Sequence, residues 1–173
     1  LMKNALIGFA LVVLCLTLFL DIRLAFWSAV GIGMSFAATF IVMALLNISV
    51  NMISLFGFIL AIGIVVDNAI VVSENIYKYG ENGVSAVKAA VTGTQRIAIP
   101  VIFSAVTTIV AFWPLTELPG TLGKFLTDIP LIVITVLTLS LFQALFILPR
   151  NLAKLDLSPI YRPNLIFRLL GAI

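Results

Sequence analysis

The chain has 173 residues, of which 62% are hydrophobic and only 10% are charged. Soluble domains contain about 45–50% apolar and about 25% charged residues, so this chain cannot cover itself with a polar surface. The composition therefore excludes a soluble domain and predicts an all-α integral membrane protein. The formal net charge is only +3, and the basic residues form no clustered basic surface. We therefore expect no nucleic-acid partner.

Five apolar runs are long enough to cross the lipid bilayer as helices, which takes about 20 residues at 1.5 Å per residue. We therefore expect a five-span helix bundle over residues 1–148. Residues 149–173 mix Arg and Lys with Leu, Ile and Phe, which predicts an interfacial segment or helix on the membrane surface. The expected spans are approximately 4–20, 24–46, 53–75, 97–115 and 129–148.

The connection between the third and fourth spans is expected to contain a short helix of its own. Residues 80–83 include two glycines and an asparagine, which mark a break. Val84, Val87 and Val91 then recur at helical spacing, as in a short amphipathic helix. Pro100 lacks a backbone donor and is expected to begin or kink the fourth span.

An odd number of spans places the two termini on opposite sides of the membrane. Only two basic residues, Lys3 and Lys124, lie on the side of the N terminus. The other eight lie on the opposite side, namely Arg23, Lys78, Lys88, Arg96, Arg150, Lys154, Arg162 and Arg168. The positive-inside rule therefore predicts a cytoplasmic C terminus. Five spans without an extramembrane domain also suggest a fragment of a longer chain.

The chain has one cysteine, Cys15, and no histidine, so an internal disulfide and a Cys/His metal site are both excluded. Cys15 lies in the first apolar run and is interpreted as a packing side chain, because free cysteine behaves as a small hydrophobe. We expect no metal and no cofactor.

Asp67 is the strongest candidate for a functional residue, because it interrupts the apolar third span. It follows Ile53 by 14 residues, about 21 Å along a helix and still within the hydrocarbon. An ionised carboxylate there costs about 2.5–3.5 kcal/mol, so Asp67 is expected to face the bundle interior or a water-filled path. Surroundings of low polarity favour the neutral form of a carboxyl group. A proton carrier is therefore the leading hypothesis, and an aspartate paired only for packing is the alternative.

Four further residues are weaker candidates. Asn68 lies about 100° around the helix from Asp67 and either orients it or forms an interhelical hydrogen bond. Glu74 follows on nearly the same face, where it either ends a proton path or marks the point at which the helix meets water. Thr107 and Thr108 of the fourth span are hydroxyls that either face water near the carboxylate or serve packing.

The segment "GIVVDNAIVVSENI", residues 63–76, resembles the fourth transmembrane helix of resistance–nodulation–division (RND) permeases, where a glycine, "VD" and "AIVV.EN" recur. "LFLDIRLAFWSAVGIGMSF" is similar to that family's join between its second and third helices. "VNMISLFGFILAIG" is similar to its lead into the fourth helix, and "IPVIFSAVTTIVAFWPL" to its fifth. The five spans would then be helices two to six of the first half, followed by the family's interfacial helix.

The resemblance implies a transporter and not an enzyme: a proton-driven multidrug efflux permease of the bacterial inner membrane, with the N terminus on the periplasmic side. It would typically be a homotrimer that works with a periplasmic adaptor and an outer-membrane channel. Asp67 would be the proton-relay carboxylate, with protons as the coupling ion. Asn68 stands where many drug pumps have a second aspartate, which leaves the number of protons open. The family's relay lysine belongs to the second half, so the cation facing Asp67 would come from the remaining half of the permease.

Two other classes of function are left open. A SecD/SecF-type translocation accessory, or a lipid or sterol exporter, would share the helical scaffold and its intramembrane aspartate. The "DNAIVV.EN" pattern argues against the secretion accessories. The other class is a membrane fragment that transports nothing. The substrate is not specified by these residues.

Overall fold

The structure, a computed structural model, describes residues 2–19 and 21–155. All the regular secondary structure in this described part is helical. The elements are α1 (Met2–Phe19), α2 (Ile22–Leu45), α3 (Met52–Glu81), α4 (Ala86–Phe112), a 3₁₀ turn (Trp113–Glu117), α5 (Gly120–Leu126), α6 (Asp128–Phe142), a π-helical turn (Gln143–Ile147) and α7 (Leu148–Leu152).

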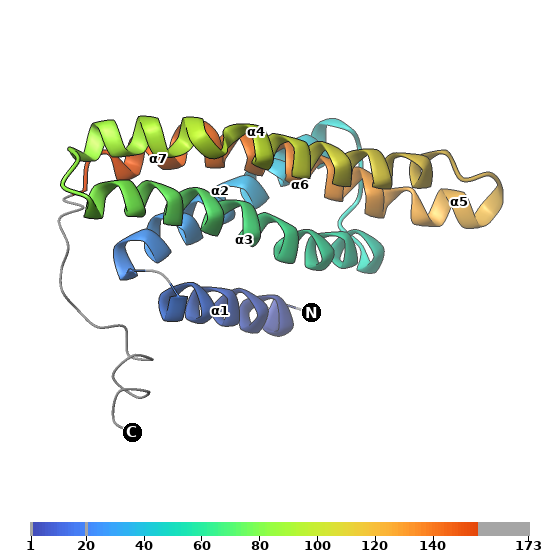
Figure 1. The fold of residues 1–173 in the computed structure, drawn as a ribbon. Helices are drawn as coiled ribbons and strands as arrows, with labels where there is room; N and C mark the ends of the chain where they lie inside the picture. The colour runs from blue at the N-terminus through green and yellow to red at the C-terminus, as the bar shows by residue number, and fades with distance from the viewer. Residues whose placement is uncertain (1, 20, 156–173) are drawn as a thin grey trace, which may run out of the picture.

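Four helical segments in this part of the chain are long and apolar enough to cross a membrane: Ile22–Leu45, Met52–Glu81, Ala86–Glu117 and Asp128–Leu152. The 18-residue α1 occupies the position of the first expected span. The prediction of an all-α membrane bundle is therefore confirmed. Figure 1 shows that successive long helices run in alternating directions, with α1 at one edge of the bundle.

The core lies where α2, α3 and α6 face one another. α3 makes its most extensive contacts with α6 and α4, whereas α1 packs mainly on α2. Ile132, Val133, Val136 and Leu137 of α6 are almost completely buried by these neighbours. Lipid tails are as apolar as these side chains, so close packing and interhelical hydrogen bonds hold such a bundle together.

α3 and α4 approach each other most closely at Gly93. A Cβ atom added there would lie 2.8 Å from Ile76 Cα and 3.1 Å from Ile76 N. Next to this crossing, Asn75 Nδ2 donates a hydrogen bond to the Gly93 carbonyl. Because Gly93 has no side chain, α3 and α4 can approach each other this closely.

The prediction of a separate amphipathic helix before the fourth span is wrong. α4 continues from Ala86 to Phe112, so the valine stripe and the apolar run belong to one helix. Pro100 lies inside α4 and does not begin it. The break comes earlier, at Gly83, whose φ of +77° suits glycine. Between this turn and Pro100 the only potential breaker is Gly93, which is held in place by its packing on Ile76.

Other boundaries also differ from those expected. α3 extends beyond residue 75 to Glu81, and the connection at residues 116–128 contains α5. Of the expected interfacial segment, residues 149–155 include most of α7, while 156–173 lie outside the described residues. The side chain of Cys15 also lies outside them.

Replacing Gly93 by alanine is expected to destabilise the bundle by about 1–3 kcal/mol, because the new methyl group collides with the α3 backbone. Thermal melting in detergent measures this loss. Gly33→Ala is the matched control, since a Cβ there meets nothing within 4 Å. Equal stability of the two variants would contradict the assigned crossing.

A buried hydrogen bond joins α2 to α3 through Ser28 Oγ and Ser73 Oγ, 2.7 Å apart. Ser73 Oγ also donates to the Ala69 carbonyl at 2.6 Å, so Ser28 is the donor to Ser73. A double-mutant cycle of Ser28→Ala and Ser73→Ala is expected to give a coupling energy of about 0.6 kcal/mol, typical of such bonds in membranes. Additive effects in the melting experiment would show that the bond contributes nothing.

Candidate functional site

The helix α3 places its two adjacent polar residues in different surroundings. Asp67 is exposed, whereas Asn68 is only 6% exposed. Successive residues of an α-helix are about 100° apart, so the rotation that buries Asn68 turns Asp67 outward. Asp67 therefore does not face the interior that the described residues form, and its expected position on a water-filled path or inside the complete bundle stays a prediction.

Asp67 lies within an exposed and otherwise apolar face of α3, composed of Phe56, Leu60, Gly63, Asp67 and Val71. These residues are three or four positions apart and so share one side of the helix. We call this surface the Asp67 face. Within residues 2–19 and 21–155, no hydrogen bond or ion pair engages the Asp67 carboxylate.

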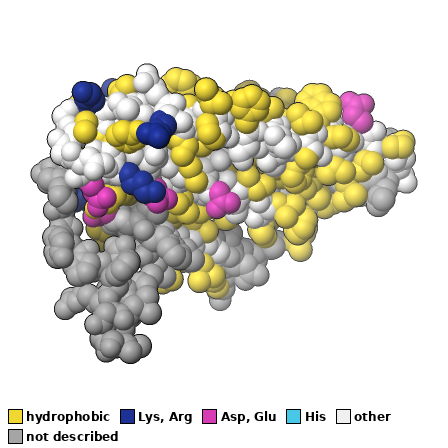
Figure 2. Space-filling view, viewed as in Figure 1, with side chains coloured by type: hydrophobic (Ala, Val, Ile, Leu, Met, Phe, Trp, Pro, Cys, Tyr) yellow, Lys and Arg dark blue, Asp and Glu magenta, His cyan; other side chains and the backbone are white. Residues whose placement is uncertain are grey.

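Charged side chains follow the Asp67 face toward the end of α3. Figure 2 shows acidic and basic groups gathered around the end where α3 meets α4, while hydrophobic side chains cover much of the opposite half. Glu74 forms a 2.9 Å ion pair with Lys78, and both side chains are more than half exposed. This arrangement supports the simpler interpretation of Glu74, in which it marks the point where α3 meets water.

Thr107 and Thr108 make no hydrogen bond to Asp67. Their hydroxyls donate to carbonyls of their own helix, those of Phe103 at 2.8 Å and Ser104 at 3.0 Å. From the crossing of Gly93 on Ile76, residue 102 of the antiparallel α4 is level with Asp67. Thr107 is therefore about 7.5 Å further along the axis. The structure does not bring these hydroxyls to the carboxylate, and their proposed role stays a prediction.

Asn68 belongs to a buried polar layer that the sequence alone did not reveal. Asn68 Nδ2 and Gln143 Nε2 are both buried, and neither has an acceptor among the described groups. A Cβ atom added at Gly57 would lie 3.3 Å from the Ile129 carbonyl oxygen and 3.3 Å from Ile132 Cβ, so α3 packs closely on α6 here. The two helices run in the same direction from this contact (Figure 1). Asn68 follows Gly57 by eleven residues, and Gln143 follows Ile132 by eleven residues. The two amides therefore lie at the same level along the bundle.

Gln143 also depends on α2. A Cβ atom added at Gly31 would overlap the Gln143 amide, so the absence of a side chain at Gly31 makes room for it. Gln143 begins the π-helical turn, and such turns occur frequently at functional sites. A sequence signal was present, because Gln143 is the one amide within the apolar run 129–148.

The comparisons with known proteins concern almost the whole chain. The family model described as the AcrB/AcrD/AcrF family matches residues 1–165. Multidrug resistance protein MdtC of Pantoea ananatis is 32% identical over 154 residues, which is 88% of this chain and 15% of that protein. MdtC of Proteus mirabilis is 35% identical over 73% of this chain and 12% of its own length. MdtC of Salmonella arizonae is 35% identical over 83% of this chain and 14% of its own length.

The chain thus spans only 12–15% of the length of these relatives. The family match nevertheless covers the helices that carry Asp67, Asn68 and Gln143. The family match and the membrane architecture agree with each other, and the chain belongs to the AcrB/AcrD/AcrF family of RND permeases.

Proposed function

We propose that this chain forms part of the membrane domain of a proton-driven multidrug efflux permease, in which Asp67 takes up and releases the coupling proton. The observation that carries the proposal is the carboxylate of Asp67, which has no partner among the described residues and lies on an exposed apolar face of a membrane-spanning helix. Multidrug resistance is what the names of the relatives state, and it supports drug export as the function.

An unpaired charge on this face is unfavourable in a membrane. Ionised, Asp67 requires a cation or water, and otherwise it binds a proton. The described residues supply no cation, so we assign that cation to a helix of the remaining half of the permease, packed on the Asp67 face. The small residue Gly63, one turn away, would let such a helix approach closely.

The proposed coupling follows from this pairing. With Asp67 ionised, its attraction to the cation holds the two halves together. Protonation removes that attraction and lets the helices shift, and release of the proton to the other side resets them. One proton crossing a potential of 100 mV releases about 2.3 kcal/mol, enough to bias a cycle of a few states.

The burial of Asn68 supports a scheme with one carboxylate on α3. An asparagine side chain carries no proton in the way a carboxylate does, and this one is buried inside the bundle and does not lie on the Asp67 face. In the complete assembly we expect a homotrimer of the inner membrane, with a periplasmic adaptor and an outer-membrane channel.

Asp67→Asn is expected to reduce proton-coupled transport to background, because an amide cannot alternate between charged and neutral forms. The measurement is proton flux and drug export by the complete permease in liposomes. Glu74→Gln is the matched control, since it removes a carboxylate two turns away on α3 and should leave transport unchanged. Full coupling in the Asp67→Asn variant would refute the proton-carrier role of Asp67.

The proposed orientation places the turn between α3 and α4 in the cytoplasm, since most of the basic residues lie at that end. In a cysteine-free background, Ser85→Cys in this turn, where the side chain is exposed, should react with a membrane-impermeant thiol reagent only after cells are permeabilised. Glu117→Cys, at the opposite end of α4, should react in intact cells. The reverse pattern would invert the orientation.

A further inference from the structure

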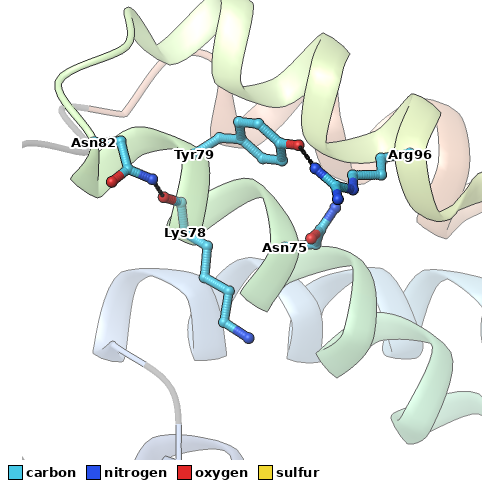
Figure 3. A pocket seen from close by; sticks show the side chains of 5 residues that line it. All are labelled: Asn75, Lys78, Tyr79, Asn82 and Arg96. Carbon is cyan, nitrogen blue, oxygen red and sulfur yellow. Dashed lines mark hydrogen bonds between the residues drawn. The ribbon is translucent and has the colours of Figure 1, made fainter.

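A hollow of about 380 Å³ lies between the last turns of α3 and the first turns of α4. Its lining consists of Asn75, Lys78, Tyr79, Asn82 and Arg96, none of which is acidic (Figure 3). We call it the Arg96 pocket. It is separate from the Asp67 face and has no part in the proposed proton coupling.

The level of the Arg96 pocket along the helices is that of the membrane surface. Arg96 directly precedes the apolar run 97–115, and Asn75 follows the apolar part of α3. Side chains of a helix tilt toward its N terminus, so Arg96 extends back along α4 toward the polar end. There its Nη1 donates to Tyr79 Oη at 2.7 Å. The guanidinium is thus carried out of the apolar region to the level of lipid headgroups.

The pocket has an excess of positive charge. Lys78 is neutralised by its 2.9 Å ion pair with Glu74, and Figure 3 shows its side chain running away from Tyr79 and Arg96. No carboxylate in the described part of the chain lies within ion-pair distance of Arg96. One full positive charge therefore faces the hollow.

Arg96 and Tyr79 supply the donors that are left free in the pocket. Tyr79 accepts from Arg96 and keeps its own hydroxyl hydrogen, and the guanidinium has further N–H groups beyond the one it uses. The amide donors of Asn75 and Asn82 are occupied by the carbonyls of Gly93 and Lys78. The side-chain oxygens of these two asparagines remain as acceptors, so an anion fits the pocket at the guanidinium of Arg96 and the Tyr79 hydroxyl.

The surrounding packing holds these donors in place. Gly93 rests on the backbone of Ile76, and Asn75 bonds to Gly93 across the same crossing. Tyr79 and Arg96 each follow that crossing by three residues on their own helix. Because the two helices cannot separate here without breaking these contacts, the pocket is formed before a ligand arrives.

We propose that the Arg96 pocket binds a phosphate group, carried either by a phospholipid headgroup or by a soluble phosphate compound. The planar guanidinium matches two phosphate oxygens at once, and the Tyr79 hydroxyl donates to a third. Basic pockets between membrane helices at this level bind phosphorylated headgroups in other proteins.

The test uses the complete permease purified in detergent, with thermal melting as the readout. It is titrated separately with phosphatidylglycerol, with inorganic phosphate and with diacylglycerol, which lacks the phosphate. In Arg96→Gln, the concentration of phosphate ligand that gives half of the maximal stabilisation is expected to rise about tenfold, because a charged hydrogen-bonding partner is lost. In Tyr79→Phe this concentration should rise several-fold. Lys88→Gln removes an exposed cation of α4 outside the pocket and should have no effect.

The ligands distinguish the two sources of phosphate. Stabilisation by phosphatidylglycerol alone assigns the pocket to lipid, and stabilisation by inorganic phosphate at comparable concentrations assigns it to a soluble compound. Diacylglycerol acting as well as phosphatidylglycerol would overturn the proposal, as would binding of neither phosphate carrier. Equal binding by Tyr79→Phe and wild-type protein would overturn the assigned role of the hydroxyl. If Arg96→Gln does not fold, the Tyr79→Phe variant takes its place in the test.

Discussion

The packing of α3 against α6 is the constraint on which the other features depend. Contacts such as those of Gly57 with Ile129 and Ile132 determine which side of α3 is buried. Once that side is chosen, Asn68 enters the interior and Asp67 points away from it. The orientation of the carboxylate is therefore a consequence of packing more than two turns away, and not of any contact that Asp67 makes itself.

α4 depends on α3 in a comparable way. Little of its apolar length is buried in the bundle. Only 11% of the most apolar 18-residue stretch within Ala86–Glu117 is buried. Its close attachment is the crossing at Gly93, beside which the Arg96 pocket lies. Residues such as Ile99, Phe103 and Val110 face outward, available to lipid or to another part of the permease.

The spans could be predicted from the sequence because a bilayer demands a minimum apolar length, and four of the long helices meet it plainly. Asp67 could be singled out because a carboxylate in an apolar run is costly. Its outward direction could not be predicted, because α3 is apolar on all sides and no polar stripe distinguishes inside from outside. The continuity of α4 was hidden for a different reason. Gly93 resembles a helix breaker in sequence, and only its contact with Ile76 shows that it serves packing.

The buried amides required tertiary information as well. Gln143 could be noticed as a polar residue in an apolar span, but its level with Asn68 follows from the register of α3 on α6. The room that Gly31 makes for it involves a third helix, more than 100 residues away in sequence. The pattern of apolar residues within one segment specifies neither the register between helices nor the contact of Gln143 with Gly31.

The threonines on the outside of the bundle have a consequence for motion. The hydroxyls of Thr107, Thr108 and Thr138 each donate to a carbonyl of their own helix. Their donors are therefore already engaged, and they offer a neighbouring helix only an acceptor. A neighbouring helix that brings no polar donor to these surfaces therefore meets them through side-chain packing alone, so its register can change in small steps.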